Sequence, residues 1–233
     1  MKIVILCGGK GTRLGFETKI IPKPMVKLDR DPIIVHLMKY YKKFGYDNFI
    51  LALGYKGAFI KKFFKKNKFS FKVKCIDTGK NTLTGGRLLK LKKFLLKDKN
   101  FMLTYGDGLT NQNLKKLEKF HIKNNKTATM TIVRPPVRFG EVKTKGLLVK
   151  NFKEKPQIKQ SWINGGFFVF NKNIFKFLGS GNEMLEKSPI EKLSKKKELL
   201  GFKHLGFWQC MDTPRDKEYL QHLIKTKRAP WKN

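Results

Sequence analysis

The chain has 233 residues, 40% of them hydrophobic and 12% aromatic, which excludes wholesale disorder and predicts one α/β domain over residues 1–233. No apolar run reaches the roughly 20 residues of a membrane span, and the short run at residues 3–6 is no signal peptide, so we expect a cytoplasmic protein without a membrane partner. The net charge of +35, from 52 Lys and Arg against 17 Asp and Glu, points to an anionic partner.

The first half of the chain alternates predicted strands with predicted helices. A continuous apolar run at residues 2–7 is typical of a buried parallel strand, and further strands are predicted at 48–53, 71–76, 100–105 and 128–133. Helices are predicted at 31–44, 57–66 and 86–96. A fourth helix is predicted to be capped by Asn111 and to carry Leu114, Leu117, Phe120 and His121 on one face. This alternation predicts an α/β fold with a doubly wound, mostly parallel sheet.

The second half of the chain has a different pattern. Strands are predicted at 141–149, 162–170 and 199–204, and helices near 171–178, 189–195 and 214–226. No linker or repeat separates the two halves. We therefore expect the second half to form a C-terminal α+β portion of the same domain.

A glycine-rich loop follows the first predicted strand, with the sequence GGKGTRL at residues 8–14. It is neither a Walker A motif nor GxGxxG, because Leu14 stands where the third glycine should be. Three glycines in four residues still let backbone N–H groups approach a polyphosphate, and Arg13 adds a bidentate phosphate donor. Ligands of α/β folds bind at this end of a strand, so the loop indicates an anion site, with a plain tight turn as the alternative.

A single lysine stands between two prolines in the sequence PKPM at residues 22–25. The prolines restrict the backbone on both sides of Lys23. A lysine fixed near an anion loop suggests a stationary positive charge for phosphate, and a polar loop with an incidental charge is the alternative.

The composition of the basic residues argues against nucleic acid as the partner. Only 7 of the 52 are Arg, the residue that grips phosphates and bases with paired hydrogen bonds, and lysines occur in nearly every segment. We interpret the charge as a compositional bias on an ordinary fold and expect no nucleic-acid partner. A basic nucleic-acid-binding protein with a degenerate catalytic domain is the alternative from another functional class.

Cysteine and histidine lack the spacing of metal ligands. The three cysteines, at positions 7, 75 and 210, form no CxxC pair, so we expect reduced thiols that are at least partly buried. Among the four histidines, at positions 36, 121, 204 and 222, His36 and His121 lie on predicted helix faces, where a packed or surface residue is expected rather than a catalytic one.

Taken together, the motifs resemble those of the sugar-1-phosphate nucleotidylyltransferases. LCGGKGTRL at residues 6–14 and PKPM at 22–25 match the signature shared by that family. TGGRL at 84–88 and FWQCMDT at 207–213 are more specific to the glucose-1-phosphate cytidylyltransferase branch, which TYGDG at 104–108 also resembles. Further similarities at 54–57, 77–79, 138–140, 154–156, 163–169 and 229–232 extend the resemblance over nearly the whole chain.

The resemblance implies a Rossmann-like nucleotide-diphospho-sugar transferase fold and an enzyme with CTP and glucose 1-phosphate as partners. The phosphate of glucose 1-phosphate would attack the α-phosphorus of CTP, giving CDP-glucose and pyrophosphate. Use of UTP or dTTP, or of another hexose 1-phosphate, is the alternative within the class.

The resemblance also implies a Mg²⁺ cofactor held by Asp107 and Asp212. Carboxylates are suitable ligands for this hard cation. From the residues alone, Asp107 could be an ordinary turn residue of Gly-Asp-Gly, and Asp212 is expected more as a helix cap than as a ligand.

The resemblance assigns the remaining roles residue by residue. It makes Arg13, Lys23, Asp107 and Asp212 the catalytic group. For the sugar phosphate it indicates Glu154, Lys155 and Asn164. The predicted nucleotide-binding residues are Leu6, Cys7, Gly8, Gly9, Lys10, Gly11, Thr12, Arg13, Lys23, Thr82, Arg87 and Gly106, with Arg87 facing the cytidine.

The chain departs from the family pattern in three places. The stretch between Gly57 and Asp77 is shorter than in the family, and it bears on subunit contacts or on the cover of the active site, so formation of a homo-oligomer stays open. Cys7 replaces a small alanine, and Lys10 replaces an apolar residue and adds charge to the glycine loop.

Overall fold

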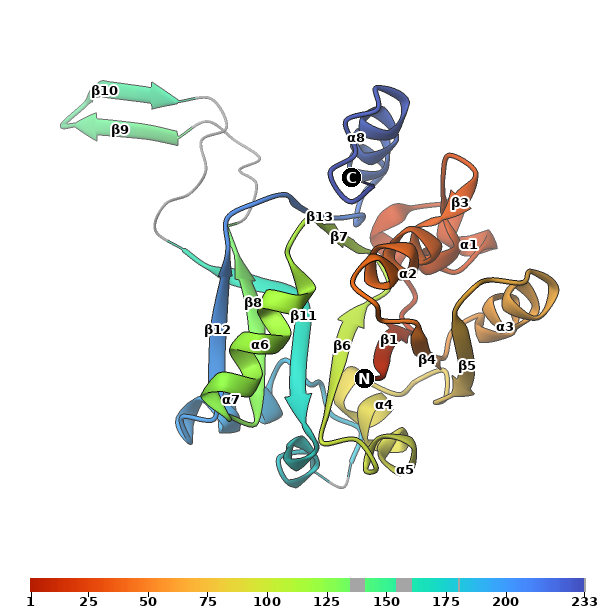
Figure 1. Ribbon diagram of the computed structural model, residues 1–233. Coiled ribbons are helices and arrows are strands. Elements are labelled where there is room, and N and C mark those ends of the chain that lie inside the picture. The colour runs from red at the N-terminus through yellow and green to blue at the C-terminus, as the bar shows by residue number, and fades with distance from the viewer. Residues whose placement is uncertain (135–140, 154–160, 180, 233) are drawn as a thin grey trace.

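The fold is built on one seven-stranded mixed sheet, shown in Figure 1. The computed structural model describes residues 1–134, 141–153, 161–179 and 181–232. The strand order is β12-β8-β11-β6-β1-β4-β5, and β11 runs antiparallel to the other six. The strands are β1 Ile3–Cys7, β4 Asn48–Leu53, β5 Lys72–Asp77, β6 Asn100–Tyr105, β8 Ala128–Val133, β11 Ile163–Asn171 and β12 Leu199–His204. The prediction of an α/β, mostly parallel sheet is confirmed.

Helices cover both faces of this sheet, because its central strands are apolar on both sides. In β1, Ile3 and Ile5 belong to one buried cluster, while Val4 and Leu6 belong to the other. The first cluster includes side chains of α2 Ile33–Lys43, α3 Gly57–Lys66, α6 Leu114–Asn124 and α8 Pro214–Lys225. The second includes those of α4 Thr84–Lys90, α5 Lys92–Leu95, the 3₁₀ helix η3 Lys172–Lys176 and α7 Ser188–Lys195. The sheet is therefore doubly wound.

The second half of the chain extends this same sheet. Strands β8, β11 and β12 pair with one another, and β11 joins them to β6. The expected C-terminal α+β portion is thus a continuation of the sheet, and α6 packs across β8 and β11 (Figure 1).

Several predicted boundaries were wrong for local reasons. The strand expected at 141–149 is a hairpin of β9 Glu141–Lys145 and β10 Leu148–Lys153, because Gly146 turns the chain at a φ of 59°; the hairpin projects away from the sheet (Figure 1). Helix α6 is capped by Asn113, which accepts a hydrogen bond from Lys116 N at 2.9 Å, rather than by Asn111. The segment 31–32 forms the short strand β3 Asp31–Pro32 beside β2 Lys27–Leu28, so the next helix begins at Ile33.

The predicted environments of cysteine and histidine are confirmed. All three thiols are free; Cys7 is buried and the other two are half-buried. His36 and His121 are buried, and each ring bonds a protein oxygen, Leu28 O at 2.8 Å and Thr129 Oγ1 at 2.9 Å. Among the residues that the structure describes, no helix is long and apolar enough to cross a membrane.

The buried ring of His121 should make stability fall in acid. Burial lowers the pKa of His121 from 6.5 to about 4. Between these two pH values the unfolded chain binds a proton at His121 that the folded chain does not bind. The contribution of neutral His121 to stability is therefore complete above pH 6.5 and is lost as the pH falls through 4. The loss amounts to about 3 kcal/mol. The free energy of unfolding in urea should therefore fall less between pH 7.5 and pH 4 in His121→Gln than in the wild type, because the variant lacks this contribution.

The exposed His222 provides the control, and His222→Gln should keep the wild-type pH dependence. His36 and His204, whose pKa values are also lowered by burial, remain in both variants, so the comparison isolates position 121. Parallel pH profiles of wild type and His121→Gln would contradict the prediction.

Candidate active site

A pocket of about 750 Å³ lies at one edge of the sheet. Its wall is formed by residues that follow β1, β5 and β6 and by the first residues of β11, which reach the same edge because β11 runs in the opposite direction. Parallel sheets bind ligands at this edge. The wall includes every predicted site residue that the structure describes, namely Leu6, Cys7, Gly8, Gly9, Lys10, Gly11, Thr12, Arg13, Lys23, Thr82, Arg87, Gly106, Asp107, Asn164 and Asp212. The predicted residues Glu154 and Lys155 lie outside the described residues.

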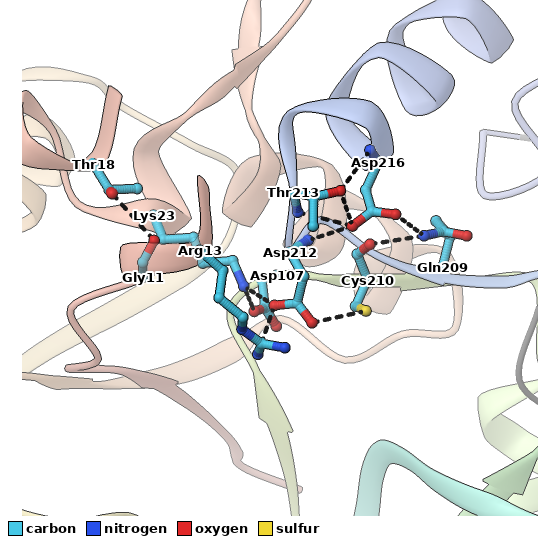
Figure 2. A network of polar contacts seen from close by, with 10 residues as sticks. All are labelled: Gly11, Arg13, Thr18, Lys23, Asp107, Gln209, Cys210, Asp212, Thr213 and Asp216. Carbon is cyan, nitrogen blue, oxygen red and sulfur yellow. Dashed lines mark hydrogen bonds and ion pairs between the residues drawn. The ribbon is translucent and has the colours of Figure 1, made fainter. Parts of the chain in front are cut away.

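The glycine-rich loop offers unpaired backbone donors to this pocket. In the described chain, the N–H groups of Gly9 and Lys10 donate to no protein acceptor. The loop then turns through Gly11, at a φ of 66°, into the 3₁₀ helix η1 Thr12–Leu14, and Leu14 is buried in the core. Thr18 Oγ1 donates to Gly11 O at 3.1 Å and fastens the turn (Figure 2). Free N–H groups beside an exposed Arg13 are donors of the kind that bind phosphate oxygens.

The PKPM segment places Lys23 directly against the glycine loop. It forms the 3₁₀ helix η2 Lys23–Met25, in which Lys23 is only 8% exposed. A β-carbon at position 11 would lie 2.8 Å from Lys23 Cβ, so a glycine at 11 permits this close approach. The lysine therefore enters the pocket from a fixed backbone, as its two flanking prolines predict.

Two carboxylates converge on the ammonium group of Lys23, as Figure 2 shows. Lys23 Nζ donates to Asp107 Oδ2 and to Asp212 Oδ1. The guanidinium of Arg13, whose side chain is 72% exposed, also pairs with Asp212 Oδ1 at 3.0 Å. We call Asp107 and Asp212 the carboxylate pair. Two like charges at one point need a cation between them, and in this structure Lys23 provides it.

A two-stranded ladder brings the carboxylate pair together. Strand β7 Gly108–Thr110 follows Asp107, strand β13 Trp208–Cys210 precedes Asp212, and the two strands pair antiparallel with Cys210 opposite Gly108. Met211 N also donates to Asp107 O at 2.9 Å. The register of this ladder therefore sets the separation of the two carboxylates.

Asp212 lies just before helix α8 and does not cap it. The cap is Thr213, whose side chain accepts from Asp216 N while Asp216 accepts from the backbone of Thr213. Asp216 Oδ2 also accepts from Asp212 N at 3.1 Å (Figure 2). The expectation from the residues alone, that Asp212 is a cap, is wrong by one position, and its carboxylate is left for the pocket.

The protonation states of this cluster follow from its charges. Burial would lower the pKa of Lys23, but attraction and hydrogen bonds from Asp107 and Asp212 outweigh it and raise that pKa. Burial likewise opposes ionisation of Asp212, yet Lys23 and Arg13 hold its pKa below the usual value. Burial and the nearby Asp212 raise the pKa of Cys210 to about 12, so this thiol stays protonated at neutral pH and is no nucleophile.

The carboxylate pair fits a hard divalent cation. Both carboxylates reach one point, now taken by Lys23 Nζ, and their oxygens are the donors that Mg²⁺ prefers. Within the described residues, no group of three or more His, Cys, Asp or Glu side chains could hold a metal by itself. The remaining ligands would come from water and from phosphate oxygens, as is usual for Mg²⁺ at nucleotide sites.

Arg87 lines the pocket, but its guanidinium donates hydrogen bonds to backbone carbonyl groups of the protein. It is 4% exposed, and its guanidinium donates to Gly8 O at 3.0 Å, Leu53 O at 2.9 Å and Gly79 O at 2.9 Å. The side chain thereby joins the ends of β1, β4 and β5. Its predicted contact with the cytidine stays a prediction. In the described chain the printed bonds of Arg87 come from Nη1 and Nη2, so the Nε–H is the donor that such a contact could use without breaking one of them.

The pocket also contains side chains to which the sequence analysis gave no role. Tyr105 and Trp208 lie inside motifs that carry the family resemblance, so their position in TYGDG and FWQCMDT was an available signal. Trp208 Nε1 donates to Gly165 O at 2.7 Å next to Asn164. Lys80, Asn81 and Met184 had no such signal, because nothing local marks them as neighbours of the pocket.

Comparison with known proteins agrees with this geometry. A sequence model described as Nucleotidyl transferase matches residues 2–217. The glucose-1-phosphate cytidylyltransferase of Salmonella typhimurium is 39% identical, over 100% of this chain and 99% of that protein. The D-glycero-alpha-D-manno-heptose 1-phosphate guanylyltransferase of Aneurinibacillus thermoaerophilus is 31% identical, over 96% and 100%. The crystal structure of HddC from Yersinia pseudotuberculosis superposes with a TM-score of 0.76 at 25% identity, over 96% and 99%. The resemblance expected from the motifs is confirmed.

Two adjacent glycines of the loop should respond differently to alanine. A β-carbon at position 8 would lie 2.0 Å from Arg87 Cζ, whereas one at position 9 has nothing within 4 Å. Gly8→Ala must displace the guanidinium from its carbonyl partners, so we expect it to lower the free energy of unfolding by about 1–3 kcal/mol. Gly9→Ala should stay within about 0.5 kcal/mol of wild type. Urea denaturation of both variants measures the difference, and equal losses would contradict this role of Arg87.

Proposed function

Because this chain belongs to the nucleotidyl transferase family, we propose that it transfers the cytidylyl group of CTP to α-D-glucose 1-phosphate, giving CDP-glucose and pyrophosphate. The observation that carries the proposal is the 39% identity to the Salmonella typhimurium enzyme over essentially the full length of both chains. The pocket supports it with groups that suit the chemistry: free backbone donors, a buried lysine and the carboxylate pair.

The reaction needs positioning and charge more than it needs a covalent intermediate. A phosphate oxygen of the sugar phosphate attacks the α-phosphorus of CTP, and the bond from that phosphorus to the bridging oxygen of the β-phosphate breaks. In our proposal, the N–H groups of Gly9 and Lys10 and the guanidinium of Arg13 hold the triphosphate. Lys23 Nζ then stabilises the charge that develops on the α-phosphate oxygens.

We propose that Asp107 and Asp212 hold Mg²⁺. When bound, this ion would neutralise charge on the phosphate oxygens and orient them for attack. Lys23 lies between the two carboxylates in this structure, so Asp107 and Asp212 also hold the lysine in position before the nucleotide binds. The lysine can leave them for a phosphate once another cation balances their charge.

The pocket lining contains candidate residues for each of the two substrates. Leu6, Cys7, Thr82 and Gly106 line the pocket together with Arg87 and are proposed to face the nucleoside. For the second substrate, we propose that Asn164 bonds the hexose and that Glu154 and Lys155 meet the sugar and its phosphate. We also propose that residues 1–233 act as a single domain, since strands from both halves build one sheet, and that the enzyme works in the cytoplasm.

A different nucleotide or sugar is the alternative within the same class. The heptose 1-phosphate guanylyltransferase, at 31% identity, has a name that specifies another base and another sugar. A change of specificity within this fold is therefore a second candidate, distinguished by substrate and not by mechanism.

The decisive experiment is a pyrophosphate-release assay with purified protein, Mg²⁺, and each pair of CTP, UTP, dTTP or GTP with glucose, mannose or galactose 1-phosphate. We expect the highest kcat/KM for CTP with glucose 1-phosphate. A hydrogen-bonding base site discriminates strongly, since a wrong base leaves buried polar groups unpaired. Preference for another pair would replace the proposed substrates and keep the reaction, and absence of pyrophosphate release with every pair would overturn the proposal.

Removing either member of the carboxylate pair should impair turnover. We expect Asp107→Asn and Asp212→Asn each to lower kcat about a hundredfold or more, because each loses a charged ligand worth several kcal/mol of transition-state stabilisation. Initial rates at saturating substrates and several Mg²⁺ concentrations measure the effect.

Asp98→Asn is the matched control, because Asp98 pairs with Lys2 at 2.6 Å and does not line the pocket. It should turn over at the wild-type rate. Circular dichroism should show that all three variants fold. Near-wild-type kcat in either pair variant would remove that residue from the mechanism.

A further inference from the structure

One wall of the pocket contains a chain of hydrogen bonds in which only Asn164 has a role in the proposed function. The hydroxyl of Tyr105 donates to Glu186 Oε1 and accepts from Asn164 Nδ2 at 3.4 Å. Asn164 Oδ1 in turn accepts from Gly166 N at 2.8 Å. Tyr105 and Asn164 face the pocket, whereas Glu186 is not among its lining residues and supports them from behind.

The carboxylate of Glu186 sets the direction of every bond in this chain. A carboxylate only accepts, so the single hydroxyl proton of Tyr105 is committed to Glu186. The tyrosine oxygen can then only accept from its next neighbour, and Asn164 must present its NH₂ group there. The N–H of Gly166 requires the carbonyl oxygen of Asn164 on the opposite side, which is the same orientation. The amide is therefore held from both ends.

The ring of Tyr105 is fixed as firmly as its hydroxyl. It packs edge-on against Phe168, with ring centroids 6.2 Å apart. Gly166 also lies against the ring, because a β-carbon there would be 2.5 Å from Tyr105 Cδ2.

Glu186 is held in turn by the start of helix α4. Its second oxygen accepts from Thr84 Oγ1 at 2.5 Å, and Thr84 Oγ1 accepts from Leu185 N at 2.8 Å. Gly85 N and Gly86 N both donate to Glu183 O. A β-carbon at position 85 would lie 2.9 Å from that oxygen. The glycine in the TGG sequence therefore leaves room for the segment that carries Glu186.

We propose that Tyr105, oriented by Glu186, is a positioning residue that presents the Asn164 amide to the sugar phosphate and thereby sets the affinity for that substrate. The inference rests on the proposed function, which assigns Asn164 to the hexose. With one amide proton directed to Tyr105 and one carbonyl lone pair directed to Gly166, Asn164 keeps one donor and one acceptor for sugar hydroxyls.

Tyr105→Phe tests this directly, because it removes the hydroxyl and keeps the ring. We expect KM for glucose 1-phosphate to rise about five- to tenfold, the equivalent of one hydrogen bond, while kcat changes less than twofold and KM for CTP stays unchanged. Glu186→Gln should move the same constant in the same direction, because a glutamine can donate to the tyrosine oxygen and so no longer fixes the direction of the chain.

A double-mutant cycle separates positioning from general structural damage. If Tyr105 acts through Asn164, Tyr105→Phe combined with Asn164→Ala should be no worse than Asn164→Ala alone. The control is Tyr46→Phe, because Tyr46 also donates to a carboxylate, that of Glu118, but does not line the pocket. It should leave both KM values unchanged, and thermal melts should show that each variant folds.

The outcomes distinguish this inference from the proposed function. A wild-type enzyme that is active while Tyr105→Phe and Glu186→Gln keep their KM for glucose 1-phosphate would overturn the inference and leave the proposed function standing. A rise in KM for CTP equal to that for glucose 1-phosphate, or additive losses in the cycle, would also overturn it. A wild-type protein that turns over no sugar 1-phosphate would overturn the proposed function, and the inference with it.

Discussion

Two carboxylates that meet at one ammonium group constrain most of the geometry around this pocket. Asp107 and Asp212 repel each other unless a cation lies between them, and Lys23 supplies that cation from a segment stiffened by two prolines. The β7–β13 ladder fixes how far apart the carboxylates stand, and a glycine at position 11 lets the lysine backbone approach. In the proposed reaction, the same lysine that balances the pair in this structure would stabilise the α-phosphate.

Among the described residues of this strongly basic chain, few Lys or Arg side chains are buried, and the buried ones have hydrogen-bond acceptors close by. Lys23 has its two carboxylates, and Arg87 has the carbonyl groups at the ends of three parallel strands. Most other lysines lie exposed or half-buried, where each contributes little to stability. Their summed field nevertheless favours the approach of small anions, which the proposed substrates are. The charge therefore suits an enzyme for nucleotides and sugar phosphates without requiring a polymer partner.

Helix α4 links the two halves of the pocket. Arg87 on this helix braces the glycine loop through Gly8, and Thr84 at its start bonds the Glu186 carboxylate that holds Tyr105. The residues proposed for the nucleotide and those proposed for the sugar thus both depend on this helix of seven residues. Its two glycines leave room for the segment that carries Glu186, and its arginine donates hydrogen bonds to carbonyl groups at the strand ends.

The sequence by itself determined the features that leave a local pattern. The apolar run of β1, the alternation of strands and helices, the glycine loop and the proline-flanked Lys23 all show within a few residues, and the family motifs placed Asp107, Asp212 and Asn164 in one site. Only the tertiary structure decided that β11 runs antiparallel, that Thr213 and not Asp212 caps α8, that Arg87 is engaged with carbonyl groups, and that Glu186 orients Tyr105. Each of these depends on groups that meet through strand register, helix packing or the competition of neighbouring side chains for one backbone donor, and such contacts leave no periodicity in the sequence from which they could be predicted.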